Sequence, residues 1–312
     1  MKLFLFEFAT CGEKIDDSIA VEGLAMFKSL YTGFKRIFEI NSFVREEFQK
    51  DFQLPYGDLS KIAEYAENSD LFLIVAPEDD DTLFRLTKLC EKFCFNLGSS
   101  SKAIQIVADK WRLYKKLKGK VNMPKTSKKV LESKFVIKPR KSCGGEGIQF
   151  SDYVPNDYIA QEYIEGKNLS VSIIVGDRPE VVSINEQILN GFKYSGAVIP
   201  ARIEGDVAFE VAEEALKAVE CIRGLRGYVG VDIVYSNIPY VIEINARLTT
   251  PSIAFEQVYQ ISSAEMIYKG LFENLELPKT FCRHMIRKEM GKCYHPYVRV
   301  GNYSLVISKY EN

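Results

Sequence analysis

The stretch Gly230–Arg247, GVDIVYSNIPYVIEINAR, decides the fold of the C-terminal half of this chain. It holds two apolar runs, GVDIVY and PYVIEINAR, on either side of the turn residues Ser236–Ile238. Two runs of β-branched and aromatic residues around a short turn are typical of a β-hairpin. Similar runs precede it from Lys134 onward, namely KFVIKP, YIAQEYI, LSVSIIVG, PEVVSINEQIL and SGAVIP. Alternating hydrophobicity with short turns predicts an antiparallel sheet.

Three oxygen-bearing side chains lie on this predicted hairpin. Glu243 and Asn245 are two residues apart on the second strand, so they point to the same face. If Asp232 on the first strand pairs across from them, the three side chains converge, and magnesium prefers such hard oxygen ligands. The alternative is an exposed sheet face with outward polar residues, which would also carry Lys or Thr. We therefore interpret Asp232, Glu243 and Asn245 as a metal site.

The N-terminal part of the chain alternates apolar strands with helices. Leu3–Phe8 and Leu71–Ala76 are predicted as buried strands, and helical patterns cover about 18–30, 59–68 and 82–93. This alternation predicts a small open α/β domain with a parallel sheet. Further helices are expected over residues 102–117, 207–222 and 252–272. The predicted fold class is therefore α/β, with α+β character in the later half.

Composition narrows the class of protein. Lys and Arg total 41 and Asp and Glu total 42, a balance that favours neither a nucleic-acid nor a membrane partner. The longest apolar run, LFLIVAP at 71–77, is too short to span a bilayer. The N-terminal MKLFLFEFATCGEK is interpreted as a first strand, because acids follow early and no cleavage site does. Seven scattered cysteines predict a reducing, cytoplasmic location.

A glycine-rich segment, FVIKPRKSCGGEGI at Phe135–Ile148, is the second candidate for chemistry. Lys138 ends a buried strand, and Gly144, Gly145 and Gly147 supply backbone N–H groups that can close on phosphates. The segment is neither a P-loop nor a dinucleotide-binding fingerprint. Its order along the chain, a strand lysine, a glycine loop, QEYIEG and then the metal hairpin, is more specific than the loop alone.

In this order the chain resembles the ATP-grasp carboxylate–amine ligases from about Leu3 to Phe272. The resemblance implies an N-terminal domain of residues 1–98, an ATP-grasp domain of 99–275 with a mobile lid at about 120–162, and an extension of 276–312. It implies ATP and two magnesium ions, or manganese in their place, as cofactors. The ATP-binding residues that it implies are Lys110, Lys138, Ser142, Gly144, Gly145, Gly147, Gln161, Glu162, Tyr163, Ile164 and Asn168. Arg247 and Lys138 are the implied catalytic residues.

The chain departs from the family at two positions. Asn168 stands where many members have a glutamate that binds the ribose, and an asparagine can still bond a hydroxyl. Gly230 stands where the D-alanine ligase branch has an arginine, which argues against that branch. Positive charge at the acyl-phosphate site must then come from Arg247 or from Arg202.

A narrower resemblance lies in FEFATCGEKIDDSIAVEGLAMFKSL at Phe6–Leu30, which is similar to the opening of the archaeal tyramine–L-glutamate ligases of methanofuran biosynthesis. It implies that the γ-carboxylate of glutamate is activated and that the amine of tyramine attacks it. Glu7 and Glu22 are then candidates for binding an ammonium group, and the alternative is an ordinary strand and helix with a solvated Glu22. Another amino acid and amine, or a nucleotide-binding regulator without catalysis, stay open, as does a homo-oligomer.

Two features remain outside this scheme. Cys282 with His284 and Cys293 with His295 form two Cys-x-His pairs that could hold zinc. Their spacing is uncommon for zinc, and a structural tail hairpin is the preferred interpretation. The basic run of Lys115, Lys116, Lys118 and Lys120 is interpreted as a solvated helix face and loop.

Overall fold

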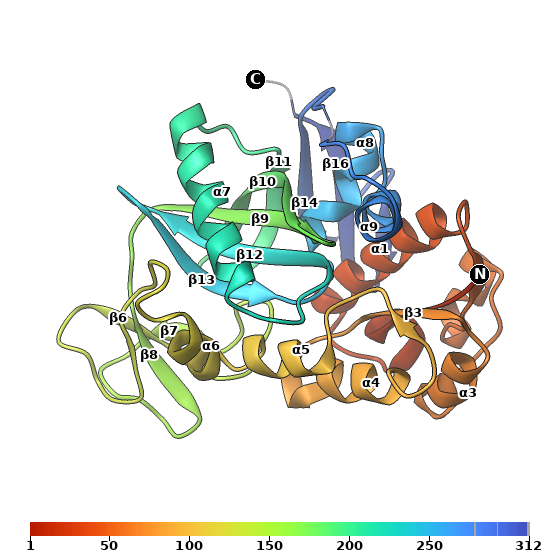
Figure 1. The fold of residues 1–312 in the computed structure, drawn as a ribbon, viewed down its shortest axis with the longest axis horizontal. Coiled ribbons are helices and arrows are strands. Elements are labelled where there is room, and N and C mark those ends of the chain that lie inside the picture. The colour runs from red at the N-terminus through yellow and green to blue at the C-terminus, as the bar shows by residue number, and fades with distance from the viewer. Residues whose placement is uncertain (278, 292, 311–312) are drawn as a thin grey trace.

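The computed structural model describes residues 1–277, 279–291 and 293–310, which form three sheets with flanking helices (Figure 1). An N-terminal α/β layer and a smaller lid lie beside a large central sheet (Figure 1). The α/β expectation for the N-terminal part and the antiparallel expectation for the rest are both confirmed by the strand pairing. No helix in the described part of the chain is long and apolar enough to cross a membrane.

The N-terminal sheet has the strand order β2-β1-β3-β4, and all its pairs are parallel. Its two central strands are apolar and buried, as is typical of a parallel sheet covered by helices; Leu3, Phe4 and Leu5 are fully buried. The strands are β1 (Lys2–Glu7), β2 (Glu39–Asn41), β3 (Leu71–Val75) and β4 (Phe95–Asn96), and the helices are α1 (Asp17–Phe34), α2 (Gln49–Phe52), α3 (Ile62–Glu67) and α4 (Thr82–Cys90). Short helical turns lie at η1 (Phe8–Gly12), η2 (Glu46–Phe48), η3 (Leu59–Lys61) and η4 (Asp79–Asp81).

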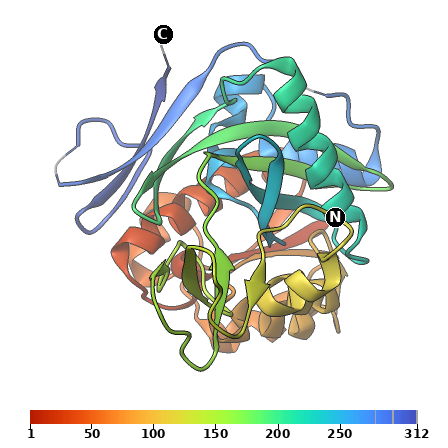
Figure 2. The same ribbon diagram turned by 90° about the vertical axis from the view of Figure 1, so that its left-hand side faces the viewer.

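The lid is a four-stranded antiparallel sheet in the order β5-β8-β6-β7. Its strands are β5 (Thr126–Ser127), β6 (Phe135–Pro139), β7 (Gln149–Phe150) and β8 (Tyr158–Glu162). A small apolar core of its own, which includes Leu131, Phe135 and Ile137, holds it together. Figure 2 shows the lid in front of and below the large sheet.

The large sheet has eight antiparallel strands in the order β13-β12-β9-β10-β11-β14-β16-β15. The strands are β9 (Lys167–Val175), β10 (Pro179–Asn190), β11 (Lys193–Ile199), β12 (Gly227–Tyr235), β13 (Pro239–Asn245), β14 (His284–Met290), β15 (Val298–Val300) and β16 (Tyr303–Lys309). Helix α7 (Gly205–Glu220) packs on β10 and β13. The predicted hairpin is confirmed as β12 and β13, with Asp232 directly opposite Glu243.

Two helices predicted as continuous are broken in the structure. The helix expected over 102–117 is α5 (Ser101–Val107) followed by α6 (Lys110–Leu117). Asp109 is extended there and accepts hydrogen bonds from the backbone N–H groups of Trp111 and Arg112, so it starts a new helix. The helix expected over 252–272 is η5 (Thr250–Ala254), α8 (Phe255–Tyr259) and α9 (Ser263–Phe272). The break follows from the left-handed Gln260 and the capping box of Ser262 and Glu265.

The C-terminal strands are part of the large sheet, because β14 pairs with β11 on one side and with β16 on the other. They also lie against α1 of the N-terminal layer, where the Lys28 Nζ donates to the Tyr297 carbonyl at 2.8 Å. The two Cys-x-His pairs lie toward opposite ends of β14, so the structure does not bring them together. Cys282 and His284 lie at the start of β14 and Cys293 and His295 follow its other end, and within the described ranges no three Cys, His, Asp or Glu side chains gather to hold a metal.

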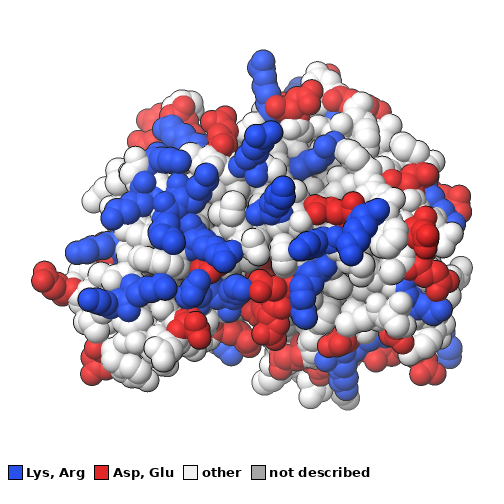
Figure 3. Space-filling view, turned by 60° about the horizontal axis from the view of Figure 1, so that its bottom comes forward, with Lys and Arg blue, Asp and Glu red and all other residues white. Residues whose placement is uncertain are grey.

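The basic run forms the exposed side of α6 and the turn after it. Lys115, Lys116, Lys118 and Lys120 are all exposed, while Leu113 and Leu117 of the same helix are buried. Figure 3 shows Lys and Arg crowded over part of one face, with Asp and Glu among them. The interpretation as a solvated face is therefore confirmed.

Candidate active site

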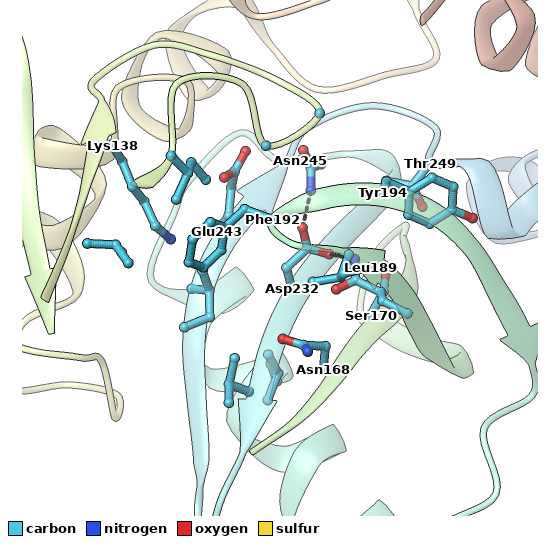
Figure 4. Close-up of a pocket in the computed structure, with 18 of the residues that line it drawn as sticks. Lys138, Asn168, Ser170, Leu189, Phe192, Tyr194, Asp232, Glu243, Asn245 and Thr249 are labelled. Atoms are coloured by element: carbon cyan, nitrogen blue, oxygen red, sulfur yellow. Dashed lines mark hydrogen bonds between the residues drawn. The ribbon is translucent and has the colours of Figure 1, made fainter. Parts of the chain in front are cut away.

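A cavity of about 270 Å³ lies between the lid and the large sheet. Lys138 of β6 and the loop after it form one wall, and the hairpin β12–β13 forms the opposite wall. Asp232, Glu243 and Asn245 all line this cavity, so the structure brings together the three predicted metal ligands. Figure 4 shows these side chains on adjacent strands with Lys138 across from them.

The geometry of the hairpin fixes this acidic face. Asp232 pairs with Glu243 and Gly230 pairs with Asn245 across the two strands. The Asn245 Nδ2 donates to Asp232 Oδ2 at 3.3 Å, and the Gln187 Nε2 of β10 donates to Asp232 Oδ1 at 3.0 Å (Figure 4). Asp232 is thereby held in one orientation by two neutral amides, which do not themselves neutralise its negative charge.

The electrostatics of this face suit a divalent cation. Burial, and next the charge of Glu243, raise the pKa of Asp232 to about 7. Two part-buried carboxylates and a buried amide on one face offer the hard oxygen donors that Mg²⁺ and Mn²⁺ bind, and a cation would remove the repulsion between the acids. The residues present therefore fit a magnesium site completed by ATP phosphates and water.

Two lysines approach the same face from the other side. Lys138 is buried, and desolvation lowers its pKa to about 8 although Glu243 opposes that shift. The Lys110 Nζ lies 3.4 Å from Glu243 Oε2 and donates to the Ser142 carbonyl at 2.9 Å. Lys110, Ser142 and Gly147 lie outside the cavity lining in the described part of the chain, whereas Lys138 forms part of it.

The predicted phosphate loop owes its shape to glycine. Gly144, Gly145 and Gly147 have φ values of 63°, 80° and 69°, which side-chain-bearing residues rarely adopt. A Cβ on Gly145 would overlap the backbone carbonyl of Phe192, so only glycine fits there. Gly144 and Gly145 line the cavity.

The loop is tied to the N-terminal domain, because the Lys141 ammonium pairs with Asp81 at 2.6 Å and the Cys143 thiol donates to Asp79 at 3.3 Å.

The predicted hinge lines a further part of the cavity. Gln161, Glu162, Tyr163 and Ile164 all line it, together with Asn168. Tyr163 packs edge-on against Phe150 and Phe192, with ring centroids 5.0 and 6.4 Å apart. The rings of Tyr163 and Phe192 in the cavity lining offer apolar surface for a flat heterocycle.

Arg247 marks the border between this cavity and a second one. Its guanidinium makes a two-pronged ion pair with Glu78, at 2.8 Å from Nε and 2.9 Å from Nη2, and both side chains are largely buried. Burial opposes the charge on Arg247, but Glu78 outweighs burial and raises its pKa above the ordinary value. Arg247 lines both cavities, so its charge acts on a group placed between them.

The second cavity, of about 370 Å³, lies between α1, the phosphate loop and the C-terminal strands. Glu22, Tyr194, Thr250 and Gly144 line both cavities, so the two form one continuous space. The structure brings Glu22 to this border, where its Oε2 accepts from Thr250 at 2.6 Å and its Oε1 accepts from Lys288 at 2.7 Å. Glu22 is thus part-buried and paired, which contradicts the alternative of a solvated side chain.

Two predicted substrate residues lie elsewhere or are otherwise engaged. Glu7 lines the second cavity, but its carboxylate caps η1 by accepting from the Ala9 and Thr10 amides and the Thr10 hydroxyl. Burial raises the pKa of Glu7, which weakens its case as an ammonium ligand. Arg202 is exposed and lies outside the lining of either cavity among the described residues.

Several residues of the site escaped prediction from the sequence. Gln187 follows Asn185 at a spacing of two in a predicted strand. Because side chains alternate along a strand, the two residues could have been placed on the same face of the sheet. Glu78, Tyr194 and Lys288 carry no local signal, because each reaches the site from an element far along the chain from the metal hairpin.

Comparison with known proteins is consistent with this geometry. The sequence profile of the ATP-grasp domain matches residues 107–251, and that of a pre-ATP-grasp domain matches residues 57–104. The tyramine–L-glutamate ligase of Methanocaldococcus fervens is 34% identical over 293 residues, which cover 86% of this chain and 96% of that protein. The chain belongs to the ATP-grasp carboxylate–amine ligases. The corresponding ligase of Methanocaldococcus jannaschii is 34% identical over 89% of this chain and 94% of its own length.

The fold of this ATP-grasp ligase is shared with solved structures. A crystal structure of an ATP-grasp superfamily protein from Archaeoglobus fulgidus is 56% identical and superposes with a TM-score of 0.94 over 100% of both chains. The predicted ATP-grasp fold and family are therefore confirmed. The domain boundaries and the roles of the site residues stay predictions.

Proposed function

We propose that this ATP-grasp ligase activates the γ-carboxylate of L-glutamate with ATP and joins it to the amine of tyramine, giving γ-glutamyltyramine, ADP and phosphate. The observation that carries the proposal is the continuity of the two cavities across Arg247. One cavity has the phosphate-binding and metal-binding groups, and the other has charged groups for a small polar substrate. The carboxylate that is phosphorylated must sit where they meet.

The cavity proposed to bind ATP would act on the phosphates mainly through charge. Magnesium, held by Asp232, Glu243 and Asn245, would neutralise the ATP phosphates and orient them. Lys138 adds positive charge from the lid, and Gly144 and Gly145 line the same space. These groups are fixed before the reaction, so they stabilise developing charge without reorganisation.

The chemistry proceeds in two displacements. A carboxylate oxygen of the substrate attacks the γ-phosphorus of ATP, the bond to the bridging oxygen breaks, and ADP leaves with an acyl phosphate formed. The neutral amine then attacks the acyl carbon, and the tetrahedral intermediate collapses by expelling inorganic phosphate and losing a proton from nitrogen. Arg247 faces the acyl oxygen in both steps and stabilises the negative charge on it. The loop at Gly144 and Gly145 excludes water that would hydrolyse the acyl phosphate.

The identity of the substrates is supported by the relatives. Two proteins named tyramine–L-glutamate ligase match 86% and 89% of this chain. A place in methanofuran biosynthesis and a cytoplasmic location are part of the same proposal. A role for Glu22 in binding the ammonium group of the substrate agrees with its position on the border of the two cavities.

The decisive experiment measures ADP release by the purified protein with L-glutamate, tyramine, ATP and magnesium, and identifies the product by mass. We expect continuous release over many turnovers only when both substrates are present, and a product with a mass equal to glutamate plus tyramine minus water. Release with a different amino acid or amine in a panel would overturn the substrate assignment alone. If no pair of amino acid and amine in the panel leads to ADP release, the ligase reaction is overturned and a nucleotide-binding regulator is favoured.

A further inference from the structure

We propose that Lys288 of β14, together with Glu22 of α1, recognises the amino-acid head of the substrate, with Lys288 binding the α-carboxylate and Glu22 binding the α-ammonium. The inference rests on the proposed function and assigns the residues that select glutamate. It gives the C-terminal strands a direct part in substrate binding.

The placement of charges along the joined cavities carries the inference. Arg247 and Glu22 line both cavities, and Lys288 lines the second cavity alone. A cation and an anion therefore lie at the border of the two cavities, and a second cation lies on the side away from the nucleotide. Glutamate bound with its γ-carboxylate at Arg247 presents the complementary charges, namely a carboxylate, then an ammonium and a second carboxylate at the α-carbon.

The Glu22–Lys288 pair is built like a binding site. The two side chains are 17% and 13% exposed, and the Lys288 Nζ lies 2.7 Å from Glu22 Oε1. A part-buried ion pair adds little to stability after desolvation is counted, so stability alone explains its presence poorly. Its other contacts are longer, since the Lys288 Nζ donates to Ser18 Oγ at 3.2 Å and to the Ser18 carbonyl at 3.3 Å. A substrate carboxylate can replace these two neutral acceptors with a charged one.

A second observation places an unsatisfied group at the same border. The Tyr194 hydroxyl is buried and has no hydrogen-bond partner among the described residues, and Tyr194 lines both cavities. A buried hydroxyl without a partner costs free energy, and a polar substrate beside it would supply one. Figure 4 shows Tyr194 beside Thr249, at the edge of the nucleotide cavity.

The competing explanation is that Lys288 only fastens the C-terminal strands to α1. Lys28 offers a matched control, because its Nζ also joins α1 to the C-terminal segment through the Tyr297 carbonyl at 2.8 Å, yet it lines neither cavity. Lys193 offers a second control, because it lines the same cavity as Lys288 but is exposed.

The test compares substrates that lack one charged group each. 4-Aminobutyrate retains the reacting carboxylate and the ammonium of glutamate but lacks the α-carboxylate, and glutarate lacks only the ammonium. We would measure kcat/KM for the three acids with tyramine and saturating ATP, in the wild-type protein and in Lys288→Met, Lys288→Arg, Glu22→Gln, Lys28→Met and Lys193→Met. Circular dichroism would check that each variant is folded.

We expect Lys288→Met to lower kcat/KM for glutamate by roughly 10- to 100-fold, as for loss of a charged hydrogen bond, and to change that for 4-aminobutyrate by less than about threefold. Lys288→Arg should retain much of the preference for glutamate. Glu22→Gln should lower the value for glutamate but not for glutarate. Lys28→Met and Lys193→Met should keep the wild-type preference.

Two results would overturn the inference while the proposed function stands. One is an equal loss with glutamate and 4-aminobutyrate in Lys288→Met, matched by Lys28→Met, which would show a fastening role only. The other is loss of the preference in Lys193→Met and not in Lys288→Met. A wild-type protein that is inactive with glutamate and tyramine would instead contradict the proposed function. The assignment of Lys288 and Glu22 to glutamate would then have no basis.

Discussion

The two cavities of this ligase are assembled in different ways. The proposed metal face of the nucleotide cavity comes from one hairpin, in which Asp232 lies directly opposite Glu243. The proposed substrate cavity draws Glu22 from α1, Arg247 from the segment after β13 and Lys288 from β14. Under the proposed function, local strand pairing specifies the phosphate chemistry, whereas the tertiary fold specifies which molecule is phosphorylated. A family can keep the first and change the second by altering packing far from the hairpin.

The largest effect on turnover is expected in the hairpin β12–β13, from Glu243→Ala. The change removes one of two carboxylates proposed to hold magnesium, and we expect turnover to fall by about 10³-fold or more, as for loss of a preorganised electrostatic group. ADP release measures the effect. Glu186→Ala is the control, because Glu186 is an acid on β10 that pairs with Lys167 at 2.9 Å outside the cavity lining in the described chain. Unchanged turnover in Glu243→Ala would refute the metal assignment.

The same contrast explains what the sequence predicts and what it does not. The hairpin and the glycine loop are each encoded within a short stretch, so strand periodicity, turn residues and glycine were enough to find them, and the short hinge motif was identified by its resemblance to the family. The partners of the substrate cavity are brought together by packing between α1 and strands more than half the chain away. No local pattern marks Lys288 or Glu78, since each is one charged residue among many on a surface-like stretch of sequence.

The next largest effect is expected at the border of the cavities, from Glu78→Gln. The amide keeps one acceptor for Arg247 but loses the charge and the two-pronged geometry. We expect kcat to fall by about 10²-fold, because misplacement of a group at the reacting centre by about 1 Å has that scale of cost. The KM for ATP should change little. Steady-state kinetics with both substrates varied would measure the two parameters.

Asp81→Asn is the control for this prediction. Asp81 lies on the same acidic turn as Glu78, but it pairs with the Lys141 side chain at 2.6 Å in a half-exposed position. Such pairs contribute about 0–1 kcal/mol. An equal loss of kcat in both variants would mean that the turn acts through the phosphate loop, and the proposed positioning of Arg247 by Glu78 would be wrong.

A smaller effect is expected from Asp109→Asn, on stability. Asp109 starts α6, pairs with Arg140, and thereby sets the position of the neighbouring Lys110. Loss of the charge should reduce the free energy of unfolding at neutral pH by about 2 kcal/mol, the sum of a weakened cap and a part-buried ion pair. Urea unfolding would measure it. An unchanged free energy would show that α5 and α6 separate for another reason.

The pH dependence of that difference gives a second check on Asp109. Burial raises the pKa of this carboxyl, but hydrogen bonds from Arg140 and the α6 amides outweigh it and lower the net pKa below the ordinary value. A group with a depressed folded pKa stabilises the protein above its unfolded pKa, and loses that contribution as the pH falls through the folded pKa. The gap between wild type and Asp109→Asn should therefore shrink in acid, below about pH 4.

The smallest effect is expected in the C-terminal strands, from Cys282→Ser. The Cys282 thiol lies 3.5 Å from His284 Nδ1 and donates to the Gln257 carbonyl at 3.2 Å. The strand that follows is held by pairing with β11 and β16, so neither a metal nor this thiol is required to hold it. We expect the free energy of unfolding to change by less than about 0.5 kcal/mol, and a chelator to leave it unchanged. Stoichiometric zinc in protein purified without chelator, with a loss of stability when it is removed, would mean that Cys282 and His284 bind metal with partners from another molecule. The substrate cavity would then depend on an ion as well as on packing, because Lys288 lies on the strand that begins at His284.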